Sequence, residues 1–364
     1  MTLIPAAPQW QGYRATADPK LLAALTPFRG HTPLWVVTSG EAGMRAQALG
    51  LAEALDTPYT EWVWPLAPPW RRWPACALLL TWLLRHALPR RRDTTPFATA
   101  WQTLCRYLEG PPQQAECASP HALDLPALHA WPQTDTPAPP RLIVACGRRV
   151  IAPVLWLKRA APTRPKVIYV QDPRTLCAQF DLIVAPAHDP IRGANVVPTP
   201  LALHRITPER LAHVAAIWQP KWAPYPKPWW GLVVGGPSRS VQWDEVLART
   251  AIRAWLEQAR AAGATLFATT ARRTPAATRA WLAQSLAAIC PGSPPPFTGE
   301  GENPYLAILA LTTQRAITSD SVSMLSETLA APGISVRLEV GTYRPRLQRF
   351  HRVWDQGAAP SADS

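Results

Sequence analysis

The sequence predicts an α/β protein with two doubly wound, Rossmann-like domains. Short apolar runs recur along the chain, and each is followed by a polar or glycine-containing loop and then by apolar residues at helical spacing. This order is typical of a parallel sheet covered by helices. The chain has 364 residues, whereas single hydrophobic cores stop growing at about 250 to 300 residues. We therefore expect two cores of ordinary size.

The composition indicates a foldable chain with a basic surface. Apolar residues make up 48% and charged residues 17%, and the formal net charge is +13 with a pI near 10.0. Such a charge favours an anionic partner, whether nucleic acid, a membrane surface or a phosphorylated substrate. No Cys-x-x-Cys pair, secretory signal or apolar run of about 18 to 20 residues is visible. We expect reduced cysteines and a cytoplasmic location.

The first domain opens with a strand, a glycine turn and a helix. After a short helix at residues 19–25, residues 34–37 predict a buried strand, Gly40 and Gly43 a tight turn, and residues 44–55 a helix. The turn lacks the third glycine of the dinucleotide fingerprint. The chain also has no Tyr-x-x-x-Lys pair, which argues against a sugar-nucleotide epimerase or a short-chain reductase.

Residues 71–92 place six arginines around an apolar centre that is too short to span a membrane. Two interpretations stay open. The segment is either an interfacial helix that attaches to anionic lipid, at about 1 kcal/mol per basic residue, or a core helix with solvated ends. Residues 111–140 are rich in proline and polar residues, and they predict an irregular surface excursion.

Three further strands of the first domain are expected at residues 141–147, 166–170 and 181–185, with a helix at residues 150–159. Polar residues follow each strand, and ligands of such sheets bind at the carboxyl ends of strands. These polar residues include Arg148, Arg149, Gln171, Asp172, Arg174, His188 and Asp189. Arginine at a helix N-terminus opposes the helix dipole, so Arg148 and Arg149 predict an anion nearby.

A proline-rich stretch with one helix, at residues 208–218, predicts the interdomain connection. The expected domains are therefore residues 1–205 and 230–364, joined by residues 206–229. The second domain is expected to contain strand 230–234, helix 243–262, strand 265–270, a helix from Pro275, a short helix near Tyr305, and strand 316–317 leading into a final helix.

Residues 315–330 read as strand, loop and helix, and the second domain is organised around them. Ser319, Asp320 or Ser321 caps the helix, and the backbone N–H groups of its first turn predict an anion site. Glu327 follows one to two turns later, where it can accept hydrogen bonds from a hydroxylated ligand. The alternative is a well-capped helix whose serines and glutamate face water.

Motifs spread over residues 34–354 resemble those of the mitochondrial fission ELM (elongated mitochondria) family, which has many bacterial members. They are Gly147-Arg148-Arg149, Gln171-Asp172-Pro173-Arg174, Pro186 with His188-Asp189, Leu203-His204, Gly235-Gly236-Pro237-Ser238, Thr269-Thr270 with Arg272-Arg273-Thr274-Pro275, Gly301-Glu302-Asn303-Pro304-Tyr305, and Thr318 to Met324 with Ser326-Glu327. The resemblance implies a GT-B glycosyltransferase fold: two facing domains, with the acceptor side in the first and the nucleotide sugar in the second.

Two departures from the relatives bear on this resemblance. Gly43-Met44 stands where relatives often carry Gly-His, so no histidine of this loop is present to act as a base. Ala331 to Val336 replaces a short Gly-Lys-Pro-Val turn, which puts a ligand contact there in doubt.

The resemblance implies a metal-independent site, since the chain has no Asp-x-Asp pair and no cofactor is expected. Arg272 or Arg273 is the candidate clamp for a departing diphosphate. The nucleotide-sugar-binding candidates are Gly43, Gly235, Gly236, Ser238, Thr270, Arg272, Arg273, Asn303, Asp320, Ser321, Met324 and Glu327, and the anion-binding candidates are Arg148 and Arg149. The candidate bases are His188, Asp189 and Glu41.

Three functions remain open. The first is a glycosyltransferase that uses a nucleotide-sugar donor on a lipid-linked or envelope-associated acceptor, in the cytoplasm or peripherally on the inner face of the cytoplasmic membrane through residues 71–92. The second is a non-catalytic module of the same fold that binds membranes or proteins. A nucleic-acid binder comes third, because the arginines are not interleaved with aromatic residues in a known module.

Overall fold

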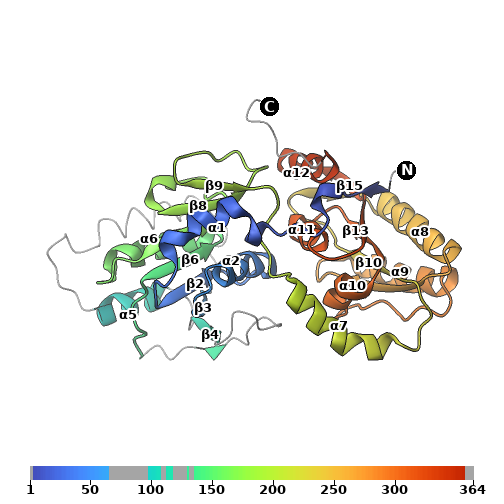
Figure 1. The fold of residues 1–364 in the computed structure, drawn as a ribbon, viewed down its shortest axis with the longest axis horizontal. Coiled ribbons are helices and arrows are strands. Elements are labelled where there is room, and N and C mark those ends of the chain that lie inside the picture. Colours follow the sequence, from blue (N-terminus) through green and yellow to red (C-terminus); the bar gives the residue numbers. More distant parts are fainter. Residues whose placement is uncertain (1–2, 65–96, 108–111, 118–128, 131–134, 357–364) are drawn as a thin grey trace. The chain divides into compact units, whose positions relative to one another are not determined.

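The computed structural model describes residues 3–64, 97–107, 112–117, 129–130 and 135–356, which form two compact units (Figure 1). One unit contains residues 15–205, and the other contains residues 1–14 together with residues 206–364. The basic segment at residues 71–92 lies outside the described residues. In the described part of the chain, no helix is both long and apolar enough to cross a membrane.

The N-terminal unit is built on a sheet with the strand order β5-β4-β3-β2-β6-β7-β8-β9. The strands are β2 (Leu34–Thr38), β3 (Tyr59–Val63), β4 (Gln113–Cys117), β5 (His129–Ala130), β6 (Leu142–Cys146), β7 (Lys166–Val170), β8 (Leu182–Pro186) and β9 (Val196–Thr199). The pairs from β3 to β9 are parallel, whereas β4 and β5 form an antiparallel edge. Every residue of β2 and β6 is buried, as expected for central parallel strands.

The helices of this unit are α1 (Pro19–Leu25), α2 (Ala42–Ala54), α5 (Phe97–Tyr107) and α6 (Ile151–Ala160). Helix α2 is fixed to the sheet by a buried ion pair, in which Arg45 donates two hydrogen bonds of 2.6 and 2.7 Å to the Glu61 carboxylate of β3. Gly50 of α2 is required for packing, because a Cβ there would overlap the backbone carbonyl of His204.

The C-terminal unit has a five-stranded sheet with the order β1-β14-β13-β10-β12 and a separate antiparallel pair, β11 and β15. The strands are β1 (Ile4–Pro5), β10 (Trp229–Val234), β11 (Val241–Trp243), β12 (Thr265–Thr270), β13 (Gln314–Thr318), β14 (Ile334–Leu338) and β15 (Gly341–Tyr343). The helices are α7 (Pro208–Trp222), α8 (Glu245–Ala261), α9 (Ala276–Ile289), α10 (Tyr305–Leu311), α11 (Val322–Leu329) and α12 (Pro345–Gln356). All pairs of the main sheet are parallel except that of β1 with β14.

The expected α/β class with parallel sheets is confirmed, and the structure departs from three of the expected boundaries. Residues 113–117 form β4, which pairs with β3, so residues 111–140 are not wholly irregular. Residues 1–14 were expected in the first domain, yet β1 pairs with β14 and Trp10 Nε1 donates a 2.8 Å hydrogen bond to Val353 O. Helix α7 packs on α10 and therefore belongs to the C-terminal unit instead of forming a separate connection.

In each of the two large sheets, the order in which successive strands are added reverses at one point. Strand β2 lies between β3 and β6, and β10 lies between β12 and β13, so successive parallel strands are added on opposite sides of the first. Crevices outside the carboxyl ends of strands at such switch points are where ligands bind in open α/β sheets. The loops after β10 and β13 meet at the switch point of the C-terminal unit, and those after β2 and β6 meet at that of the N-terminal unit.

Candidate functional site

The loops after β10 and β13 are joined by a buried carboxylate. Asp320 Oδ2 accepts a 3.1 Å hydrogen bond from the backbone N–H of Gly236, and Asp320 Oδ1 accepts one of 2.6 Å from Thr318 Oγ1. Thr318 Oγ1 in turn accepts a 2.7 Å bond from the N–H of Gly235. The Asp320 side chain is 0% exposed. The Asp320 carboxylate, a group of the protein itself, therefore occupies the glycine loop at the switch point.

Both glycines of this loop are required by close approach. A Cβ at position 235 would overlap the Asp320 carboxylate, and one at position 236 would overlap the backbone carbonyl of Arg273. From the sequence, these glycines were expected to bind the nucleotide sugar. In the structure their N–H groups donate to Thr318 and Asp320, so the glycines first serve to bring three loops together.

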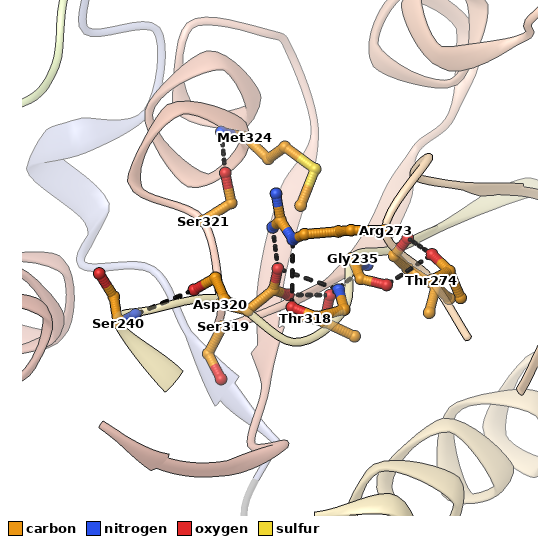
Figure 2. Close-up of polar contacts among 12 residues, drawn as sticks. Gly235, Ser240, Arg273, Thr274, Thr318, Ser319, Asp320, Ser321 and Met324 are labelled. Atoms are coloured by element: carbon orange, nitrogen blue, oxygen red, sulfur yellow. Dashed lines mark hydrogen bonds and ion pairs between the residues drawn. The ribbon is translucent and has the colours of Figure 1, made fainter. Parts of the chain in front are cut away.

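The structure distinguishes between the two candidate clamp arginines. Arg273, after β12, forms an ion pair with Asp320, and its Nε donates a 3.1 Å hydrogen bond to the carbonyl of Gly236. Figure 2 shows its guanidinium between Asp320 and the Met324 side chain, which extends from the first turn of α11. Arg272 is exposed, and no hydrogen bond or ion pair joins it to the described residues. The charge of Arg273 is therefore compensated, whereas that of Arg272 is available to a ligand.

Ser321 is the N-cap of α11, since its Oγ accepts from Met324 N at 3.4 Å. Ser319 has a different role: its Oγ lies 2.7 Å from Leu338 O and 2.5 Å from Tyr343 Oη, and its carbonyl lies 2.7 Å from His351 Nε2. Burial and the nearby Arg337 lower the pKa of His351 to about 4. A neutral His351 therefore donates to the Ser319 carbonyl and holds the loop that carries Asp320.

Glu327 accepts a hydrogen bond from Tyr305 Oη. The glutamate side chain is partly exposed, yet its surroundings desolvate the carboxyl group and raise its pKa to about 7, against a lowering effect of the Tyr305 hydrogen bond. Burial and the neighbouring Glu327 raise the pKa of Tyr305 well above its usual range, so the phenol remains the donor. The predicted acceptor of ligand hydroxyls is therefore already hydrogen-bonded through one oxygen.

A buried arginine lies beneath this pair. Arg315 is 0% exposed and donates to the backbone carbonyls of Thr312 at 3.2 Å and Thr328 at 3.1 Å, and also to that of Pro332. Burial lowers its pKa to about 10. Because helix ends leave carbonyls without partners inside the helix, this arginine joins the ends of α10 and α11.

The remaining polar candidates of the C-terminal unit organise its loops. Asn303 Oδ1 accepts from Thr269 Oγ1 and from Tyr305 N, both at 3.0 Å, and so ties the start of α10 to β12. Thr270 Oγ1 donates to Phe297 O at 3.0 Å. Ser238 is exposed, and its Oγ accepts from Ser240 N at 3.1 Å.

In the N-terminal unit, the loops after β2 and β6 are also linked. Arg149 donates a 3.3 Å bond to Glu41 Oε1, and Ser39 Oγ donates a 2.5 Å bond to Glu41 Oε2. The Arg149 and Glu41 side chains are 39% and 44% exposed. Gly147 has φ +105°, and a Cβ there would lie 2.9 Å from the Met44 sulfur. Gly43 lies in the first turn of α2, and Arg148 is exposed at the start of a 3-10 turn.

The other two candidate bases are buried. His188 Nε2 lies 3.8 Å from Asp189 Oδ1, and their side chains are 0% and 1% exposed. The backbone carbonyl of Asp189 accepts a 2.8 Å bond from Arg192. Of the three candidates, Glu41 is therefore the one that solvent reaches.

Two features near these sites are not visible in the sequence. Tyr305 was quoted only as part of a motif, and its contact with Glu327 joins residues too far apart in sequence for spacing to reveal. After β7, the non-glycine residues Gln171, Arg174 and Leu176 have positive φ angles of 80°, 62° and 55°. Strained backbone of this kind often occurs at functional sites, and the Asp172 side chain fixes it by accepting from Arg174 N at 2.7 Å.

Comparisons with known proteins relate this chain to one protein family. The family model described as "Mitochondrial fission ELM1" matches residues 42–359. The mitochondrial fission protein ELM1 of Arabidopsis thaliana is 27% identical over 214 residues, which are 52% of this chain and 49% of that protein, so the match spans about half the length of this relative.

Two solved structures align with most of this chain. The UDP-GlcNAc 2-epimerase from Methanocaldococcus jannaschii aligns with 10% identity and a TM-score of 0.41 over 90% of this chain and 93% of its own. The UDP-GlcNAc 2-epimerase from Neisseria meningitidis, bound to UDP-GlcNAc, aligns with 10% identity and a TM-score of 0.39 over 80% and 78%.

Proposed function

This chain belongs to the mitochondrial fission ELM1 family, and on that premise we propose that it is a metal-independent glycosyltransferase whose C-terminal unit binds the nucleoside diphosphate of a nucleotide-sugar donor. The observation that carries the proposal is the meeting of the glycine loop, Arg273, Asp320 and the N-terminus of α11 at the switch point between β10 and β13. The proposed acceptor is lipid-linked or associated with the cell envelope.

A diphosphate at this point needs a cation that is not already paired. A helix N-terminus contributes only about 0.3 to 2 kcal/mol toward binding an anion, and the pairing with Asp320 compensates Arg273. A leaving diphosphate therefore needs an additional cation, and the exposed Arg272 supplies a planar guanidinium suited to two phosphate oxygens. Such fixed donors stabilise the charge that develops as the bond from the sugar to the diphosphate breaks.

Glu41 is the general base in this proposal. Ser39 and Arg149 fix its carboxylate, and it remains accessible to solvent. In such a transfer the acceptor oxygen bonds to the sugar carbon, a base takes the hydroxyl proton, and the diphosphate leaves with the electron pair of the broken bond.

A second function is supported by particular residues. The burial of His188 and Asp189 and the presence of Met44 in the first glycine loop favour a module that binds the nucleotide sugar without transferring it. Release of nucleoside diphosphate from a bound nucleotide sugar, measured over time, distinguishes the two: the transferase releases it with a suitable acceptor, and the non-catalytic module does not.

The proposal predicts that a nucleoside diphosphate stabilises the protein in the presence of EDTA. At ten times its dissociation constant, a ligand that binds only the folded protein adds about 1.4 kcal/mol, which raises Tm by about 3 to 6 °C for a unit of this size. Thermal denaturation with ADP, GDP, UDP, CDP and TDP checks this, with the matching nucleosides as controls. No shift with any diphosphate at millimolar concentration would contradict the proposal.

A further inference from the structure

The proposed function gives no role to the hydrogen bond between Tyr305 and Glu327. Tyr305 begins α10 and Glu327 lies in α11, so the contact joins two helices of the C-terminal unit. Tyr305 donates to Oε2 of the carboxylate, and no described residue donates to Oε1. Glu327 is also partly exposed. One oxygen is therefore held, and the other is open to a ligand.

The position of the tyrosine is itself fixed. Asn303 accepts from Tyr305 N at 3.0 Å, and Arg315 fastens the carbonyl ends of both helices through Thr312 and Thr328. The ring packs with the cluster formed by Leu309, Ala330 and Ala331. Because a carboxylate that is held in one orientation loses less freedom on binding, this arrangement prepares Glu327 for a directed hydrogen bond.

We infer that Tyr305 is a positioning residue, which orients the Glu327 carboxylate so that its free oxygen accepts hydrogen bonds from the ribose hydroxyls of the bound nucleotide. The inference rests on the proposed nucleotide site and deepens it, because it assigns selectivity for ribonucleotides over 2′-deoxyribonucleotides to this pair. Tyr305 itself does not touch the ligand. Its hydroxyl acts only through Glu327.

The pair also makes this selectivity dependent on pH. An ionised carboxylate is the stronger acceptor, and the pKa of Glu327 lies near 7. Binding that uses this carboxylate strengthens as the pH rises through that value. The groups facing the pair are Arg315 from β13, which lies beside the phenol, and Tyr305 from α10, whereas α11 carries no other charged residue. Since the Tyr305 hydrogen bond lowers the pKa of Glu327, its removal moves the transition to higher pH.

The test is calorimetric titration between pH 5.5 and 8.5 with ADP, GDP, UDP and CDP and their 2′-deoxy counterparts. The wild type is expected to prefer the ribonucleotide by about tenfold or more at pH 8, as for a hydrogen bond to a charged group. In Tyr305→Phe, which keeps the ring, the preference falls by about threefold or more and the pH transition moves upward. Glu327→Gln is expected to remove the preference for the ribonucleotide. Its affinity should then vary with pH only through the ionisation of the phosphates.

Tyr225→Phe is the matched control, because Tyr225 precedes β10 and its ring lies against Phe267, with no hydrogen bond or ring contact to Tyr305 or Glu327. It is expected to match the wild type. If a probe binds the wild type, and Tyr305→Phe keeps both the ribose preference and the pH transition, this inference is wrong and the proposed function stands. Binding of no probe to the wild type overturns both.

Discussion

Replacing Asp320 with alanine is expected to lower the free energy of unfolding of the C-terminal unit by about 3 to 5 kcal/mol. The Asp320 side chain is 0% exposed and accepts from Gly236 N, Thr318 Oγ1 and Arg273. Its removal leaves a buried N–H group and an arginine without their acceptor. Urea denaturation followed by far-UV circular dichroism measures the change in midpoint.

Asp244→Ala provides the control within the same unit. Asp244 is exposed and accepts from Leu247 N at 3.0 Å as the N-cap of α8, a role worth about 0.5 to 2 kcal/mol. Both variants lose one carboxylate and one backbone hydrogen bond, but only Asp320 links three loops. If Asp320→Ala costs no more than Asp244→Ala, the buried carboxylate does not hold the switch point together.

Arg272→Ala is expected to weaken binding of a nucleoside diphosphate by about 1.5 to 3 kcal/mol, or about 10- to 160-fold, with little change in nucleoside binding. The exposed Arg272 has no partner among the described residues, so its loss should change stability by no more than about 0.5 kcal/mol. Arg273→Ala should differ, because it leaves the Asp320 carboxylate buried without its cation and therefore destabilises the unit. Calorimetric titration and denaturation of both variants separate the two roles.

Arg253→Ala is the control for loss of charge. Arg253 is exposed in the middle of α8, so its removal changes the net charge as Arg272→Ala does but touches no loop of the switch point. Equal weakening by Arg253→Ala and Arg272→Ala would attribute the effect to the general positive field and would argue against a clamp at residue 272.

The sequence patterns located most of the described helices but only seven of the fifteen described strands, and these seven belong to the parallel parts of the sheets, where strands are buried on both faces. Residues 265–270, predicted as a strand, are β12 with every residue buried. Strands that form only by pairing with a distant strand could not be recognised from the sequence. Strand β4 has the polar sequence Gln-Gln-Ala-Glu-Cys and is defined by its pairing with β3. Strand β1 pairs with β14, which lies near the other end of the chain.

The candidate site was predicted as a set of residues but not as an arrangement. Gly235, Arg273 and Asp320 were all identified, since each follows a strand of one sheet. Their spacing gives no sign that the Asp320 carboxylate enters the glycine loop and pairs with Arg273. The same limit applies to His188 and Asp189: a position after a strand suggests a loop at the surface, whereas packing buries both side chains.

Amide hydrogen exchange with and without a nucleoside diphosphate reports where on the chain the ligand binds, and so tests whether the diphosphate binds at the switch point of the C-terminal unit. We expect the diphosphate with the largest thermal shift, in EDTA, to slow exchange in the loop at residues 271–274, which carries Arg273, and in the first turn of α11 at residues 322–324. Protection confined to residues 39–44 and 147–149 of the N-terminal unit, or no protection at saturating ligand, would contradict it.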